Sequence, residues 1–272
     1  MTDWKKILSV AASEAQRACE VAIEGGDRAR HVGIGAAGDR TLVADREAER
    51  AIVDILLQQD DTRVLSEEAG ERGPKQAGRL AIVDPLDGSS NFSRGIPFYC
   101  TSICIVEGAN IRNAYAAIVR NLVTGDVYYA ERGKGASKNG AKMRPSATSE
   151  LTDCVAAIDL SKASIQVIER MGKLSSKVGR QVHFGANALE MCMAADGQVD
   201  TFVDLRGKMR ITDAAGSYLI GKEAGITITS EAGGEIDPPL DLSARMNVVA
   251  TSNRVLHSKV LAELSSFTER RL

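Results

Sequence analysis

The sequence has few cysteines, and they follow no pattern. There are five, an odd number, and none stands in a CxxC pair. Disulfide frameworks and cysteine-ligated metal sites need paired or clustered cysteines, so we expect buried, reduced thiols. The three histidines are also far apart, with no spacing typical of metal ligands. The cysteines are Cys19, Cys100, Cys104, Cys154 and Cys192.

Long apolar runs and an excess of one charge are missing as well. No run approaches the roughly 20 apolar residues of a membrane helix. The N-terminal segment is charged and amphipathic, without the apolar core of a secretory signal. The net charge of -2 creates no field that would attract nucleic acid or an anionic membrane. We therefore expect a cytoplasmic location, with no nucleic-acid or membrane partner.

What is present describes an ordinary globular chain. Hydrophobic residues make up 44 % and charged residues 26 % of the 272 residues. This length allows one large core or two joined halves. The first helix is predicted over 4–24, where apolar residues recur every three or four positions until Gly25-Gly26. The glycine-rich stretch 33–40 is predicted to be a mobile loop, and a second helix opens at Asp45.

Strand patterns dominate the next part of the chain. Short strands are predicted at 64–65 and 80–83, and an antiparallel meander over 98–130. The polar, glycine-rich stretch 131–140 is the expected boundary between two halves. The second half alternates strands and helices, which is typical of an α/β layer. Its predicted strands are 155–158, 181–184, 199–203, 226–229 and 247–250, and its predicted helices are 161–176, 186–195, 213–224 and 255–272. The halves are thus 1–135, α+β with an antiparallel sheet, and 136–272, α/β.

The stretch Asp84–Phe92 carries the strongest chemical signal. Two acids, Asp84 and Asp87, follow the apolar run Leu80-Ala81-Ile82-Val83. Pro85 is expected to end that strand, and Gly88 to allow a sharp turn with free backbone N–H groups. Acids beside such a turn can hold a hard cation and an anion together. The pattern therefore indicates metal-assisted phosphate chemistry.

Further acids stand at the predicted ends of other elements. Glu67 follows the strand at 64–65, and Asp213 lies where a helix should start. An acid at a helix start is commonly a cap, and this applies to Asp45 and Asp213 alike. Magnesium favours a few carboxylate ligands, so a joint site is the alternative for Glu67, Asp84, Asp87 and Asp213.

Four motifs, in the right order, resemble those of the inositol monophosphatase superfamily. Asp84–Phe92 resembles the DP(I/L)DGTxNF signature, Ser66-Glu67-Glu68 the G/S-E-E motif, and Thr212–Gly216 the WDxAAG motif. Gly133–Ala136, before Asn139-Gly140, also matches. Leu86 and the run Phe202–Gly207 look most like archaeal members, which are inositol monophosphatases and fructose-1,6-bisphosphatases.

The resemblance implies a layered αβαβα sandwich, usually as a homodimer, and a magnesium-dependent phosphomonoesterase. Two magnesium ions are implied per active site. A third stays open, since the loop before Asp45 offers only Asp39. Metal-activated water would attack phosphorus directly, with Asp45 and Ser89 positioning and deprotonating it. The implied metal ligands are Glu67, Asp84, the Leu86 carbonyl, Asp87 and Asp213, with Glu67 also catalytic. The implied substrate-binding residues are Asp87, Gly88, Ser89, Ser90, Gly185, Ala186, Asn187 and Arg206.

Arg206 marks a departure that concerns the substrate. Seven residues before the aspartate of the WD-type motif, mammalian-type relatives carry a glutamate that takes inositol hydroxyls, and this sequence has Arg206. Arginine suits a second phosphate, as in fructose 1,6-bisphosphate, although a solvated basic turn explains it too. The expected substrates are inositol monophosphate, fructose 1,6-bisphosphate, or both. The alternatives are a 3′-phosphoadenosine 5′-phosphate phosphatase and a non-catalytic regulatory or binding homologue.

Overall fold

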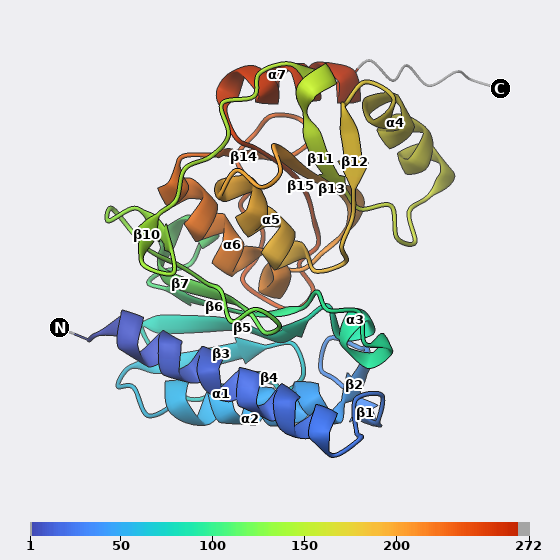
Figure 1. Ribbon diagram of the computed structural model, residues 1–272. Helices are drawn as coiled ribbons and strands as arrows, with labels where there is room; N and C mark the ends of the chain where they lie inside the picture. Colours follow the sequence, from blue (N-terminus) through green and yellow to red (C-terminus); the bar gives the residue numbers. More distant parts are fainter. Residues whose placement is uncertain (1, 266–272) are drawn as a thin grey trace.

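The structure is a computed structural model, and it describes residues 2–265 of the chain. Five layers alternate helices with sheets (Figure 1). An eight-stranded sheet and a five-stranded sheet enclose one pair of helices, and each sheet carries another pair on its outer face. The predicted layered αβαβα sandwich is therefore confirmed. The helices are α1 Trp4–Glu24, α2 Val43–Leu56, α3 Ser89–Arg94, α4 Ile165–Ser175, α5 Asn187–Ala195, α6 Ile211–Ala224 and α7 Arg254–Ser265.

The larger sheet has the order β10-β9-β8-β7-β6-β5-β3-β4. All its pairings are antiparallel except that between β3 and β5, which is parallel. The meander expected over 98–130 is β6 to β8. Two further strands, β9 and β10, lie beyond residue 135 and still join this sheet, while the division into halves stays a prediction. The strands are β3 Thr62–Ser66, β4 Gly70–Arg72, β5 Arg79–Asp87, β6 Cys100–Val106, β7 Ala114–Asn121, β8 Val127–Glu131, β9 Ala136–Lys138 and β10 Ala141–Lys142.

The smaller sheet has the order β12-β11-β13-β15-β14. Its pairings of β11 with β12 and β13 are parallel, and those of β15 are antiparallel. Helices α5 and α6 fill the space between the two sheets, whereas α4 and α7 cover the outer face of the smaller one. The strands are β11 Val155–Ile158, β12 Arg180–Val182, β13 Thr201–Met209, β14 Thr227–Thr229 and β15 Met246–Thr251.

Several predicted boundaries were wrong. Strand β5 does not end before Pro85 but continues to Asp87, because the β5–β6 register shifts between Asp84 and Asp87. A proline is tolerated at such an irregularity, where its missing N–H breaks no regular ladder bond. The stretch predicted as a loop over 33–40 belongs to a hairpin of β1 His31–Ile34 and β2 Arg40–Leu42.

Predicted helices also differ in extent. Helix α4 starts at Ile165 rather than 161, since the hydroxyl of Ser164 accepts the N–H of Val167 and caps it. The closing helix is described to Ser265, and the rest of its predicted range, 266–272, lies outside the described residues. Within residues 2–265, no helix is long and apolar enough to cross a membrane.

Candidate active site

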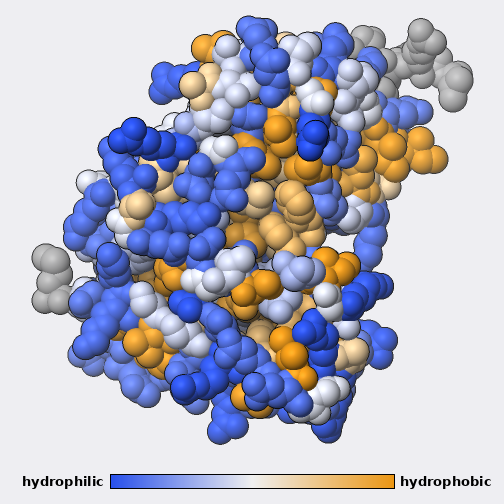
Figure 2. All heavy atoms as spheres, viewed as in Figure 1, coloured by the Kyte–Doolittle hydropathy of each residue, from blue (hydrophilic) through white to orange (hydrophobic). Residues whose placement is uncertain are grey.

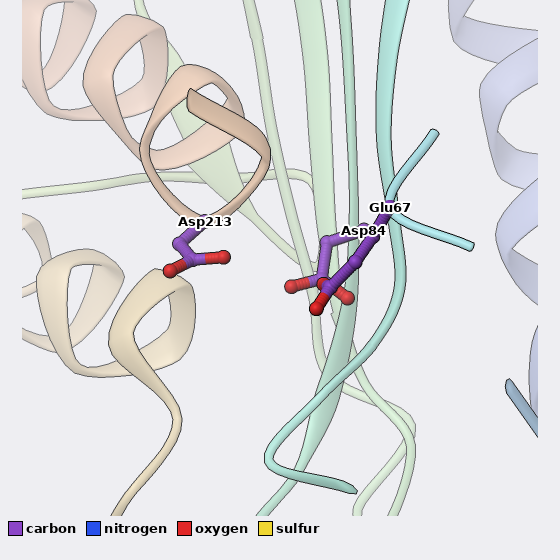
Figure 3. A group of neighbouring side chains, drawn as sticks. All are labelled: Glu67, Asp84 and Asp213. Atoms are coloured by element: carbon purple, nitrogen blue, oxygen red, sulfur yellow. The ribbon is translucent and has the colours of Figure 1, made fainter. Parts of the chain in front are cut away.

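Three acids from different elements meet at one place. Glu67 follows β3, Asp84 lies in β5 and Asp213 lies in the first turn of α6. Each can offer an oxygen such that all three oxygens lie within 4.8 Å of one another. Figure 3 shows the carboxylates of Glu67 and Asp84 side by side, facing that of Asp213 from the helix opposite. A group of oxygens this close suits a hard divalent cation.

The sheet itself brings Glu67 and Asp84 together. Strands β3 and β5 run parallel with Ser66 opposite Val83, and the N–H of Glu67 continues the pairing by donating to the Val83 carbonyl (3.3 Å). The residues that follow this pair, Glu67 and Asp84, are therefore two acids side by side. The N–H of Leu86 donates to Asp84 Oδ1 (3.0 Å), which fixes that side chain. The strand pairing thus brings together Glu67 and Asp84, two acids of the expected joint site, whereas Asp87 is not part of the close group.

Asp87 lies beside this group rather than inside it. Its Oδ2 accepts the N–H of Ala188 (2.7 Å) in the first turn of α5. Burial, followed by the charge of Asp213, raises the pKa of Asp87 to about 8. Asp87 thus connects the acid group to the segment that begins α5.

Burial and mutual repulsion make it unfavourable for all of these acids to be ionised at once unless a cation is bound. Burial and then the neighbouring charge of Glu67 raise the pKa of Asp84 well above its usual range. Burial and then Asp213 do the same for Glu67, and burial raises the pKa of Asp213. Charges held this close and this dry need a counter-cation. The all-oxygen donor set and its electrostatics therefore fit a bound magnesium ion.

Arg210 is a site residue that the sequence analysis did not assign. Its guanidinium donates to Glu67 through one terminal nitrogen and to Asp39 through the other. Burial is the largest single effect on Arg210 and lowers its pKa. The neighbouring acids, Glu67 and Asp39 among them, together outweigh it, so the pKa of Arg210 is raised. Its position just before the Thr212–Gly216 motif was the available signal, but nothing local says which way its side chain turns.

Asp45 is buried next to the acid group. Helix α2 starts two residues earlier than predicted, so Asp45 is its third residue and not its N-cap. Its Oδ2 instead accepts the N–H of the N-cap residue Leu42 (2.7 Å), as in a capping box. Burial raises the pKa of Asp45 to about 7, and the hydrogen bond from Leu42 opposes part of this rise. No direct hydrogen bond joins Asp45 to Ser89 in the described part of the chain.

Gly88 forms the sharp turn that the sequence predicted. Its φ of 89° is left-handed, and a Cβ there would lie 3.0 Å from the Phe98 carbonyl oxygen and 3.2 Å from the Ala186 Cβ. Only glycine fits this conformation and this space. Helix α3 begins directly after it, and the first amides of a helix have no partner within the helix. Ser89 and Ser90 are those first residues.

Comparison with known proteins agrees with this geometry. The profile described as the inositol monophosphatase family matches residues 3–269. This chain belongs to the inositol monophosphatase family. A fructose-1,6-bisphosphatase/inositol-1-monophosphatase of Methanothermobacter thermautotrophicus is 35 % identical, over 96 % of both chains. One of the same description from Archaeoglobus fulgidus is 38 % identical, over 86 % of this chain and 88 % of that one.

A crystal structure of an inositol monophosphatase-fructose 1,6-bisphosphatase superposes with a TM-score of 0.85. It is 30 % identical, and the match covers 96 % of this chain and all of that one. The inositol monophosphatase family consists of metal-dependent phosphatases that act on phosphoric monoesters. The predicted family, fold and class of enzyme are thereby confirmed.

The segments expected to contact substrate are joined to one another by hydrogen bonds and close contacts. Asn91 ties them together, since its Nδ2 donates to the carbonyls of Phe184 (2.6 Å) and Phe98 (2.8 Å). The N–H of Gly185 donates to Glu190 Oε1 (2.8 Å), and Ala186 packs against the Gly88 turn. Asn187 begins α5, next to the Ala188 amide that Asp87 accepts.

Arg206 is largely buried between two acids, not in an exposed basic turn. Its Nε and one terminal nitrogen donate to Asp204 (2.8 and 2.6 Å), and the same terminal nitrogen lies 2.5 Å from Asp159. The other terminal nitrogen donates to the Ser161 carbonyl (3.1 Å). The solvated-turn alternative is therefore wrong, because the side chain is only 10 % exposed.

Proposed function

We propose that this protein is a magnesium-dependent phosphomonoesterase that hydrolyses inositol monophosphate, fructose 1,6-bisphosphate, or both. The observation that carries the proposal is the convergence of the buried Asp84 with the partly buried Glu67 and Asp213. Relatives with both activities in their descriptions support the choice of substrates. Every acid of the implied ligand set is present, which favours an enzyme over a regulatory or binding homologue.

The acid group and the Leu86 carbonyl would hold two magnesium ions, with Asp87 as a further ligand. Bound magnesium neutralises phosphate oxygens and lowers the pKa of water. The proposal includes no third ion, because Asp39, the acid that the loop before Asp45 offers for it, is paired with Arg210. Asp84 uses only Oδ1 to accept the Leu86 N–H, whereas Glu67 is already paired with Arg210.

Asp45 and Ser89 would prepare the attacking water. A carboxylate with a pKa of about 7 can hold and release a proton near neutral pH, as a general base must. The Ser89 hydroxyl can both donate and accept a hydrogen bond, and it would orient that water toward phosphorus. Serine retains the hydroxyl of the threonine that is usual in the family, with a freer rotamer.

The Gly88 turn would receive the phosphate. The amides of Gly88, Ser89 and Ser90 precede or open α3, where backbone N–H groups suit an anion. Arg206 and Asn187 would contact the rest of the substrate. The guanidinium of Arg206 is already held by Asp204 and Asp159, so its direction is fixed before substrate binds.

A homodimer and a cytoplasmic location complete the proposal. Apolar side chains gather on the surface over α4 (Figure 2), where Ile165 is 72 % and Ile168 44 % exposed, and such a surface supports self-association. All five cysteines are buried and free, which is in keeping with a reducing compartment. Apparent mass in solution at several concentrations tests the first point.

Phosphate release tests the activity directly. The purified chain is incubated with inositol 1-phosphate, fructose 1,6-bisphosphate or adenosine 3′,5′-bisphosphate, with magnesium or with EDTA. We expect magnesium-dependent release from the first, the second, or both. Asp213→Asn is the negative variant, and Asp54→Asn, on the exposed face of α2, is its matched control. No turnover of any of the three compounds would refute the proposal, and preference for the adenosine compound would favour the alternative phosphatase.

A further inference from the structure

Arg210 contacts two of the three converging acids. Its guanidinium donates to Glu67, and its backbone N–H donates to Asp213 Oδ2 (3.2 Å). Among residues 2–265, no other cationic side chain is hydrogen-bonded to Glu67, Asp84 or Asp213. One positive charge therefore faces the acid group, from the residue that immediately precedes α6.

The two arms of the guanidinium lie in different surroundings. Glu67 is mostly buried, with a side chain 15 % exposed, whereas Asp39 is 62 % exposed. An ion pair with a buried acid is weakly screened, and one with an exposed acid is screened by water and salt. The contact with Glu67 is therefore the one that matters for the charge of the site.

We propose that Arg210 is the resident counter-cation of the metal site: it neutralises Glu67 in the metal-free protein, and a divalent ion must displace it from Glu67. This rests on the proposed function, because it takes the acid group as a metal site. A guanidinium and a divalent ion compete for the same carboxylate, so Arg210 lowers metal affinity while it stabilises the metal-free fold.

Asp39 gives the displaced guanidinium a partner. The hairpin that carries Asp39 is attached independently of Arg210, because Ala36 and Ala37 donate backbone N–H groups to the carbonyls of Glu68 (2.8 Å) and Glu67 (3.0 Å). The hairpin therefore stays in place when Arg210 leaves Glu67. The positive charge then rests against Asp39, beside the site and not within it.

The test measures metal binding without turnover. Manganese(II) is titrated into metal-free protein, and free ion is followed by its electron paramagnetic resonance signal, in wild type, Arg210→Gln and Arg210→Lys. Arg17→Gln, which removes an exposed charge on α1, is the matched control. We expect Arg210→Gln to bind manganese about ten-fold more tightly and to unfold at a lower temperature when metal-free. Arg210→Lys keeps a positive charge near Glu67 and should stay within about three-fold of wild type.

The outcomes separate the two proposals. If wild type binds manganese and Arg210→Gln binds it no more tightly, the role of Arg210 is refuted and the metal site stands. That role is refuted in the same way if the metal-free Arg210→Gln protein is as stable as wild type. If wild type binds no manganese and releases no phosphate, the proposed function fails, and this inference fails with it.

Discussion

Asp45 and Asp213 occupy the same position in two helices, the third residue of α2 and of α6. Each carboxylate accepts the backbone N–H three residues earlier, from Leu42 at 2.7 Å and from Arg210 at 3.2 Å. Both charges also act on Asp84, whose pKa they help to raise after burial and nearer acids. The capping role and a role in the site are therefore compatible, because the amide occupies one oxygen of each carboxylate. The other oxygen of Asp213 accepts the hydroxyl of Thr212 (3.3 Å).

This arrangement allows a clean test of Asp45. Asp45→Asn keeps an oxygen that can accept the Leu42 amide, so α2 should remain capped while the general base is lost. We expect kcat to fall by about 10²- to 10⁴-fold, with thermal stability near that of wild type. Ser89→Ala should also lower kcat, and Ser89→Thr should retain it.

The double variant decides whether Asp45 and Ser89 act together. If they hold the same water, Asp45→Asn with Ser89→Ala should be little slower than the worse single variant. Fully multiplicative losses in steady-state kinetics would show that the two residues act separately.

Gly88→Ala should destabilise the protein more than glycine replacement at an open turn. The left-handed φ costs a non-glycine residue about 1–2 kcal/mol, and the close Phe98 carbonyl adds a steric cost. Gly133→Ala is the matched control, since Gly133 has a φ of 78° with nothing within 4 Å of the added carbon. Urea unfolding measures both, and equal losses would contradict the close packing of the Gly88 turn.

The stability of the metal-free protein should fall as pH rises. The pKa values of Asp45, about 7, and Asp87, about 8, lie above the usual value of 3.8, so the folded state holds protons that the unfolded state has released. Their favourable contribution is complete below about pH 4 and is lost as pH rises through 7 and 8. Thermal melts in EDTA at pH 5 and pH 8 should show the loss.

Excess magnesium and one variant serve as controls for that pH effect. Magnesium binds the ionised acids, so it should stabilise the protein much more at pH 8 than at pH 5. Asp87→Asn should weaken the pH dependence of the metal-free protein. A metal-free protein that gains stability between pH 5 and pH 8 would count against the raised pKa values.

Arg206→Lys is the informative substitution at the proposed substrate contact. Arg206→Glu would place a third acid against Asp204 and Asp159, and removal of a buried partner typically costs about 3–5 kcal/mol. Lysine keeps the charge but cannot donate to both acids in a fork. If Arg206 binds the second phosphate, kcat/KM for fructose 1,6-bisphosphate should fall at least about ten-fold, with that for inositol 1-phosphate changed far less. Equal losses on both substrates would refute the second-phosphate role.

Local patterns predicted much of the fold. The spacing of apolar residues predicted α1 to its glycine end, and alternating strands and turns predicted β6 to β8. These signals succeed because a helix or hairpin depends on residues a few positions apart. Local reasoning failed at Pro85, where the path of β5 depends on its pairing with β6 rather than on the proline.

The sequence by itself determined which acids could serve the site and the turn at Gly88, because charge type and a left-handed backbone are properties of single residues. Tertiary structure alone decided that Glu67, Asp84 and Asp213 meet, since parallel pairing of β3 with β5 and the packing of α6 against the sheet bring them together. It also decided the partners of the two arginines. Arg206 turns toward Asp204 and Asp159 and Arg210 toward Glu67, because side-chain direction follows the charges that folding places nearby.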